Sequence, residues 1–179
     1  MYSMHVPTES YVPPGSPVAL VTAWTRRARE SQFAHYAMAD RLAARGQWLG
    51  VAVILISTLI GTSVFASIAA AEDAPTWAKL IVGCLSVMAA VMSALQTFFK
   101  FSERAERHRV FGARYGAVRR ELEAFLASGT VDMQTQYIMV LREKLDRIAE
   151  EAPDVDNGVF DTVRQGLRHP EHPTNAVTA

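Results

Sequence analysis

The sequence has little that could support catalysis, cross-linking or metal binding. It contains one cysteine, Cys84, so no internal disulfide can form, and no Cys/His spacing typical of a metal site surrounds it. We interpret Cys84 as a small hydrophobic side chain packed among helices rather than a reactive thiol. A glycine-rich phosphate loop, an HExxH motif and a GxSxG motif are also missing. We therefore expect a protein that is not an enzyme and holds no cofactor or metal.

The chain also has no net charge, because 18 basic residues balance 18 acidic ones. This balance gives no general attraction to nucleic acid, and we expect no nucleic-acid partner. The first 20 residues show no basic segment followed by an apolar one, so we expect no secretory signal. Residues 1–17 contain four prolines and are predicted to be a disordered leader. Residues 169–179 are predicted to be a disordered tail.

Charge is absent from two long runs of the chain. Gly46 to Ala71 contains no charged residue in 26 positions, and Leu80 to Phe99 contains none in 20. A bilayer core needs roughly 20 helical residues, and a chain in hydrocarbon must satisfy its own backbone hydrogen bonds. Transmembrane helices are therefore predicted at about 47–70 and 80–99. The eight-residue linker EDAPTWAK predicts a tight antiparallel hairpin, and two such runs make a buried hairpin in a soluble protein the weaker alternative.

The basic residues are distributed unequally around this hairpin. Twelve lie in the two flanks, whereas the linker has only Lys79, together with Glu72 and Asp73. The positive-inside rule predicts that both flanks, and hence both termini, are cytoplasmic. We expect a multi-pass membrane protein. The flanking basic residues are Arg26, Arg27, Arg29, Arg41, Arg45, Lys100, Arg104, Arg107, Arg109, Arg114, Arg119 and Arg120.

The flanks themselves predict helices at about 18–46, 100–127 and 131–151. Steps of three and four indicate one apolar stripe on each of the first two, so these helices should pack antiparallel as a stalk that extends the hairpin. Gly129 is a good helix-terminating residue, and a further short helix is possible near 159–167. The predicted fold is all-α, with a single domain over 18–168. The two stripes are Trp24, Ala28, Ser31, His35, Met38, Leu42 and Phe101, Ala105, His108, Phe111, Tyr115, Val118, Leu122, Phe125.

Small residues repeat every fourth position on more than one face of each run. Ser57 and Gly61 are one such pair, and Ser86 begins another series that continues to Ala90 and Ala94. Faces of this kind let membrane helices approach closely. Packing within the hairpin would explain one face of each helix. A second face would be available for self-association, so we expect a homo-oligomer in the lipid bilayer.

A polar group lies near the end of the second run, formed by Ser93, Gln96 and Thr97. Gln96 could bond across the hairpin or reach the interface, and alternatively these side chains could line a pore. No ionisable residue lies within either run, which argues against a proton-coupled transporter. One hairpin encloses no pore, so any channel must be oligomeric.

His35 and His108 fall on the two stripes at similar distances from the apolar runs. They are candidates for a pH- or ligand-sensitive latch in the stalk. The alternative is ordinary packing and hydrogen bonding between the helices.

Several parts, taken in order, resemble the SLATT family, the two-transmembrane effectors associated with bacterial nucleotide-synthetase (SMODS) and SLOG conflict systems. The resemblance covers about 29–154. It includes ADRLAARGQWLG before the hairpin, the tight hairpin, FFKFSERAERHRVFGARYGAVRRELEAF after it, and LREKLDRIAEEAP ended by a proline.

This resemblance implies an effector of antiphage defence that stays silent until a partner enzyme makes a nucleotide signal. On activation such effectors assemble in the inner membrane and breach it. The sequence contains no fused synthetase or nucleotide sensor, so the sensing step would lie either in the cytoplasmic helices or in a partner encoded nearby. The alternative function is a membrane anchor or scaffold, which recruits a cytoplasmic partner through its stalk without forming a pore.

Overall fold

The computed structural model describes residues 12–70, 75–131 and 135–168, and every regular element within these ranges is helical. The helices are α1 (Pro17–Ala70), α2 (Thr76–Phe99), α3 (Phe101–Ala127), α4 (Thr135–Glu151) and α5 (Asn157–Arg168). The predicted all-α fold is confirmed. The predicted leader lies mostly outside the described residues, as do the tail and residues 132–134.

Helix α1 is one uninterrupted helix of 54 residues. At 1.5 Å per residue it is about 80 Å long, enough to include both the predicted helix before the first run and the run itself. Pro17 stands at its first position, where the missing N–H costs no helical hydrogen bond. No later proline interrupts it.

The second half of the hairpin does not continue as α1 does. The predicted stalk extends both helices of the hairpin, but on this side the chain breaks at Lys100, where φ is 47° and ψ is 44°. This left-handed conformation ends α2 and precedes α3. Helix α3 ends as predicted, with Gly129 at φ 67°.

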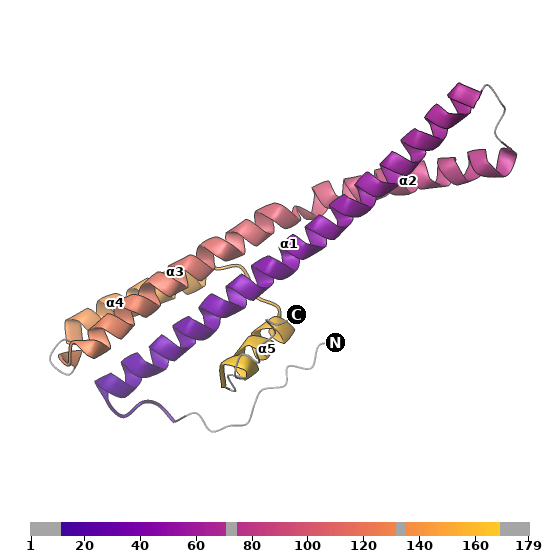
Figure 1. The fold of residues 1–179 in the computed structure, drawn as a ribbon. Coiled ribbons are helices and arrows are strands. Elements are labelled where there is room, and N and C mark those ends of the chain that lie inside the picture. Colours follow the sequence, from indigo (N-terminus) through magenta and orange to yellow (C-terminus); the bar gives the residue numbers. More distant parts are fainter. Residues whose placement is uncertain (1–11, 71–74, 132–134, 169–179) are drawn as a thin grey trace, which may run out of the picture.

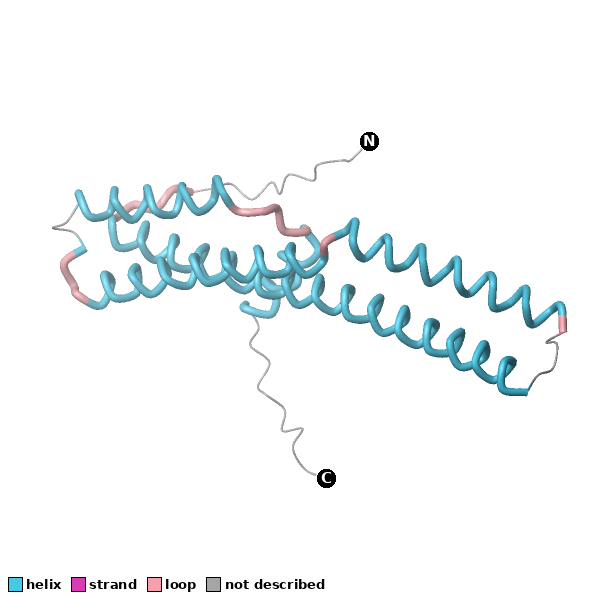
Figure 2. The backbone as a smooth tube through the Cα atoms, turned by 90° about the horizontal axis from the view of Figure 1, so that it is seen from above, coloured by secondary structure: helices cyan, strands magenta, loops and turns pink. Residues whose placement is uncertain are grey.

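The elements form two parts, shown in Figures 1 and 2. We call residues 47–70 of α1 together with α2 the hairpin segment. The rest of α1 together with α3, α4 and α5 forms the bundle segment. In the bundle α1 and α3 lie side by side and antiparallel, with α4 packed on α3 and α5 on α1. Figure 1 also shows α1 and α2 crossing each other in the hairpin.

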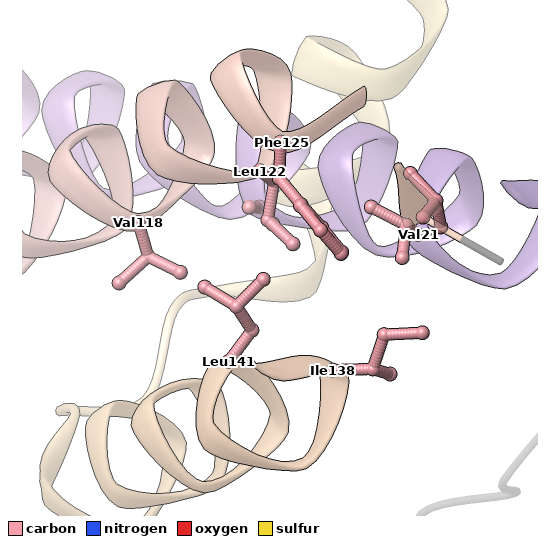
Figure 3. Packing of buried hydrophobic residues seen from close by; sticks show 8 residues of the cluster. Val21, Val118, Leu122, Phe125, Ile138 and Leu141 are labelled. Atoms are coloured by element: carbon pink, nitrogen blue, oxygen red, sulfur yellow. The ribbon is translucent and has the colours of Figure 1, made fainter. Parts of the chain in front are cut away.

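The apolar core lies in the bundle and is continuous across three helices. Val21 from α1, Leu122 from α3 and Leu141 from α4 are fully buried or nearly so. Figure 3 shows Leu141 and Ile138 of α4 facing Val118 and Leu122 of α3. A second cluster joins α1, α3 and α5. Its buried members are Met38, Leu42, Ala105 and Val159.

The hairpin segment instead exposes its apolar side chains. Leu55, Phe65 and Leu80 keep 65%, 75% and 69% of their surface exposed. Two helices are long and apolar enough to cross a membrane, and their apolar stretches are not buried within the protein. Apolar surface of this extent requires a cover, and hydrocarbon of bilayer thickness matches its length. A buried hairpin of a soluble protein is therefore wrong.

Candidate functional site

The contact between α1 and α2 combines large apolar side chains with small residues. On α2 the shielded positions recur at steps of three and four, at Val82, Leu85, Ala89 and Met92. Ala89 is the one buried residue of α2. On α1 the partly shielded positions include Val53, Ile56 and Ile60. The hairpin therefore closes on one apolar seam.

Most of the small and polar residues that we singled out lie outside this seam. Ser57, Ser86 and Ser93 are exposed, and so are Ala90 and Ala94. Gly61 is partly shielded, but a Cβ added there would meet no atom within 4 Å. Packing within the hairpin therefore does not occupy these faces. Their role in association stays a prediction.

Two of the hydroxyl groups in this region, those of Ser86 and Thr97, donate within their own helix. Ser86 Oγ donates to the carbonyl of Val82 at 2.9 Å, and Thr97 Oγ1 donates to that of Ser93 at 3.2 Å. Such back-bonding lets a hydroxyl face lipid without an unpaired donor. The same hydroxyls keep acceptor capacity for a neighbouring helix or for water.

Gln96 is exposed and leans over α1. A Cβ added to Gly50 would lie 3.4 Å from Gln96 Nε2, so the absence of a side chain at Gly50 makes room for the amide. A similar close approach occurs four residues earlier on α1. A Cβ at Gly46 would lie 3.1 Å from the Cβ of Phe101. The end of the hairpin is thus closely packed beside the break at Lys100.

His35 and His108 meet in the middle of the bundle. Their Nδ1 atoms are 3.0 Å apart and both residues are 3% exposed. One ring must donate Nδ1–H and the other must accept, so the two rings carry different tautomers. Tyr115 stacks on His35, with ring centroids 5.5 Å apart. The two residues are neighbours, while their role as a latch stays a prediction.

Burial keeps both rings uncharged at neutral pH. Burial, followed by repulsion from His108, lowers the pKa of His35 to about 4. Burial, followed by the charges of Arg104 and Arg107, lowers the pKa of His108. Two adjacent imidazolium rings would repel each other here, with the guanidinium groups adding to the repulsion.

Two glycines of the stalk were missed by the sequence analysis. Gly112 and Gly116 of α3 are buried four residues apart. A Cβ at Gly112 would lie 2.9 Å from the ring of Tyr36, and one at Gly116 would lie 2.8 Å from Gln32 Nε2. The glycine pair therefore sets how closely α1 and α3 approach. The signal was present in the sequence as two glycines four residues apart, beside the apolar stripe.

A buried carboxylate was also missed. Glu30 is 9% exposed, and Arg164 of α5 donates from Nε to its Oε2 at 3.4 Å. Arg26, one turn before Glu30, lies 3.9 Å from the other oxygen. This pair holds α5 against α1. Glu30 and Arg164 are 134 positions apart, so local sequence spacing could not predict the pairing.

Comparison with known proteins gives one informative match. The family described as SMODS and SLOG-associating 2TM effector domain family 4 matches residues 24–177. No curated protein matches the chain, and no solved structure matches it. The match includes the hairpin and all of α3, α4 and α5, and the family description agrees with two exposed apolar helices. The chain therefore belongs to the SMODS and SLOG-associating two-transmembrane effector (SLATT) family, as a membrane effector of conflict systems.

Proposed function

We propose that the protein is a pore-forming effector of bacterial antiviral defence that acts as a homo-oligomer in the inner membrane. The hairpin crosses the bilayer twice, and both termini lie in the cytoplasm. The chain stays silent until a nucleotide signal is made by a synthetase, or detected by a sensor, encoded nearby. It breaches the membrane physically and is not an enzyme.

The observation that carries this proposal is the position of the small-residue faces. The hairpin closes through its apolar seam, so Ser86, Ala90 and Ala94 stay exposed along one side of α2. Helices in lipid associate through such small residues because these allow close backbone approach. A second copy of the hairpin is the partner that we propose for this side, and Ser57 and Gly61 offer a comparable face on α1.

The pore would be lined by the polar residues near the bundle end of α2. Ser93, Gln96 and Thr97 are all exposed, and each can turn a hydrogen-bonding group toward water. In the single chain Gln96 leans over Gly50, whereas in an assembly it would face the lumen. This assignment requires several copies, because one hairpin encloses no space.

The silent state would depend on the contact between α1 and α3. The histidine pair and the close approach of Gly112 to Tyr36 hold these helices together in the middle of the bundle. A signal that separates them would free the hairpins to associate differently. His35 and His108 are therefore proposed as the latch.

Membrane potential tests the proposal directly. The chain is expressed in bacteria with its operon partners, the system is induced, and a potential-sensitive dye is followed. We expect depolarisation on induction. No depolarisation, with the protein shown to be in the membrane, would reject pore formation and favour an anchor or scaffold.

Leucine substitutions separate a pore from an anchor. Ala90→Leu and Ala94→Leu together fill the small-residue side of α2 and should abolish depolarisation. Cys84→Leu and Met88→Leu are controls on exposed positions of another side of the same helix and should leave it intact. Membrane insertion should be equal in both variants. Equal depolarisation in the two would contradict assembly through this face.

A further inference from the structure

A groove lies where the hairpin meets the bundle. It has a volume of about 610 Å³ and is bounded by α1, the last turn of α2 and the first turns of α3. Its lining combines polar and charged side chains with apolar surface from Ala43, Phe101 and Ala105. The side chains that matter for the argument are Gln47, Gln96, Thr97, Lys100, Glu103 and Arg109.

The break between α2 and α3 lies along this groove. Lys100 adopts the left-handed conformation, so α3 leaves α2 in a new direction instead of continuing its line. On the opposite side Gly46 allows Phe101 to pack against α1. The groove is therefore formed by the course of the backbone at Lys100 and Gly46, and no flexible side chain has to move to open it.

The groove lies at the end of the apolar runs, at the level where the headgroup layer of a membrane would be. Trp48 follows Gln47 directly and is 75% exposed at the start of the first apolar run. Gln96 and Thr97 belong to the last turn of the second run. The groove thus lies where exposed apolar surface gives way to charged surface. In a bilayer this level is occupied by lipid headgroups and by interfacial tryptophan.

The lining carries charges of both signs. Lys100 Nζ lies 3.1 Å from Glu103, and Arg109 lies 3.8 Å from Asp40 and 3.9 Å from Glu106. Lys100 and Glu103 are 61% and 70% exposed in their side chains, so both can exchange partners at small cost. A purely anionic ligand would meet these carboxylates, whereas a ligand with a phosphate and an ammonium group meets both signs.

We propose that the groove binds the headgroup of a zwitterionic aminophospholipid. The phosphodiester accepts hydrogen bonds from the Lys100 ammonium and the Gln96 amide. The lipid ammonium group lies against Glu103 and Glu106. The inference rests on the proposed placement of the hairpin across the bilayer, but it does not require that a pore forms.

Lipid retention tests the site. Protein purified in detergent is exchanged against phosphatidylethanolamine or phosphatidylglycerol of equal chain length, and retained lipid is counted by native mass spectrometry. We expect preferential retention of the ethanolamine lipid. Lys100→Gln should reduce it about tenfold, since a charge-assisted hydrogen bond is lost. Arg104→Gln, the same charge change one turn along α3 and outside the groove, should leave it unchanged.

Further arms identify which part of the lipid is recognised. Glu103→Gln with Glu106→Gln should remove the preference for ethanolamine over glycerol headgroups. Soluble glycerophosphoethanolamine and inorganic phosphate should compete weakly, because they lack the acyl chains. Strong competition by inorganic phosphate would instead assign a soluble anion site and overturn the proposal.

Two results would contradict the inference outright. One is equal lipid retention by Lys100→Gln and Arg104→Gln, with helix content unchanged by circular dichroism. The other is equal retention of both headgroups by the original protein. Neither result involves membrane potential. If the original protein depolarises the membrane but retains both lipids equally, this site is rejected and the proposed function is not affected.

Discussion

At the scale of single residues, the histidine pair is the clearest link between sequence and chemistry. His35 and His108 are 73 positions apart, yet their Nδ1 atoms are within hydrogen-bond distance. The contact satisfies one polar atom of each ring in a part of the bundle that is otherwise apolar and aromatic. Buried polar groups are costly when unpaired, so the two residues depend on each other.

This dependence gives a prediction for acid. The pKa of His35 falls to about 4 in the folded state, while an unfolded chain titrates near 6.5. The unfolded state therefore binds more protons between these values. Stability is complete above the unfolded pKa and falls as pH drops toward 4, by up to about 1.4 kcal/mol per pH unit for His35. Thermal unfolding in detergent from pH 7 to 4.5 should show this decline.

Paired leucine substitutions provide the control. His35→Leu with His108→Leu should flatten the decline relative to the original protein, because both titrating groups are gone. His35→Leu alone should cost about 1–3 kcal/mol at pH 7, since it leaves His108 buried without its partner. An unchanged pH profile in the double variant would show that other groups cause the acid sensitivity.

Gly112 gives a second prediction at this scale. Gly112→Ala places a Cβ 2.9 Å from the Tyr36 ring, so that either the ring or α1 must shift. We expect a loss of about 1–3 kcal/mol in unfolding free energy, measured by chemical denaturation. Gly166→Ala is the control, because nothing lies within 4 Å of it in α5, and it should be neutral or stabilising. Equal effects would argue against a steric origin.

At the scale of elements, the two sides of the hairpin differ in continuity. Helix α1 carries the bundle and the first apolar run without interruption, whereas α2 and α3 are separated at Lys100. A movement of the bundle would therefore be transmitted through α1 to the hairpin segment. Because the chain breaks at Lys100, α2 does not continue the line of α3 and can cross α1.

The conformation of Lys100 predicts that glycine is better there. A non-glycine residue in the left-handed region costs roughly 1–2 kcal/mol. Lys100→Gly should therefore stabilise the fold by about 1 kcal/mol in chemical denaturation, despite the flexibility it adds to the unfolded chain. Ser102→Gly, two residues later inside α3, should instead destabilise by about 1 kcal/mol. The opposite order would indicate that Lys100 is not strained.

At the scale of the whole molecule, the family membership and the exposed apolar segments give a membrane location, and the distribution of basic residues predicts its orientation. Twelve basic residues flank the hairpin at the bundle end, so the bundle should be cytoplasmic. The short segment that joins α1 to α2 should then face the opposite side of the membrane.

Cysteine labelling in intact cells measures this orientation. Cys84→Ser first removes the native thiol. Thr76→Cys, at the start of α2, should react with a membrane-impermeant maleimide once the outer membrane is permeabilised. Ser102→Cys, at the start of α3, should react only after the inner membrane is lysed. The reverse pattern would invert the topology and place the bundle outside.

The sequence by itself determined the elements and the solvent that each one faces. Two charge-free runs require helices in hydrocarbon because no other structure satisfies their backbones, and steps of three and four placed Phe111, Leu122 and Leu42 on the buried stripes. These are local properties, fixed by neighbours a few residues away. The left-handed break at Lys100 was not foreseen, because nothing in its immediate sequence ends a helix.

Only the tertiary structure decided which residues meet. The registry of α1 against α3 joins His35 to His108 and brings Tyr36 over Gly112, and α5 returns to pair Arg164 with the buried Glu30. It also showed that the hairpin closes on its apolar seam and leaves Ser86 and its companions exposed. Periodicity identifies the faces of a helix. Which face contacts which other helix depends on how well the side chains of segments distant in the sequence pack together.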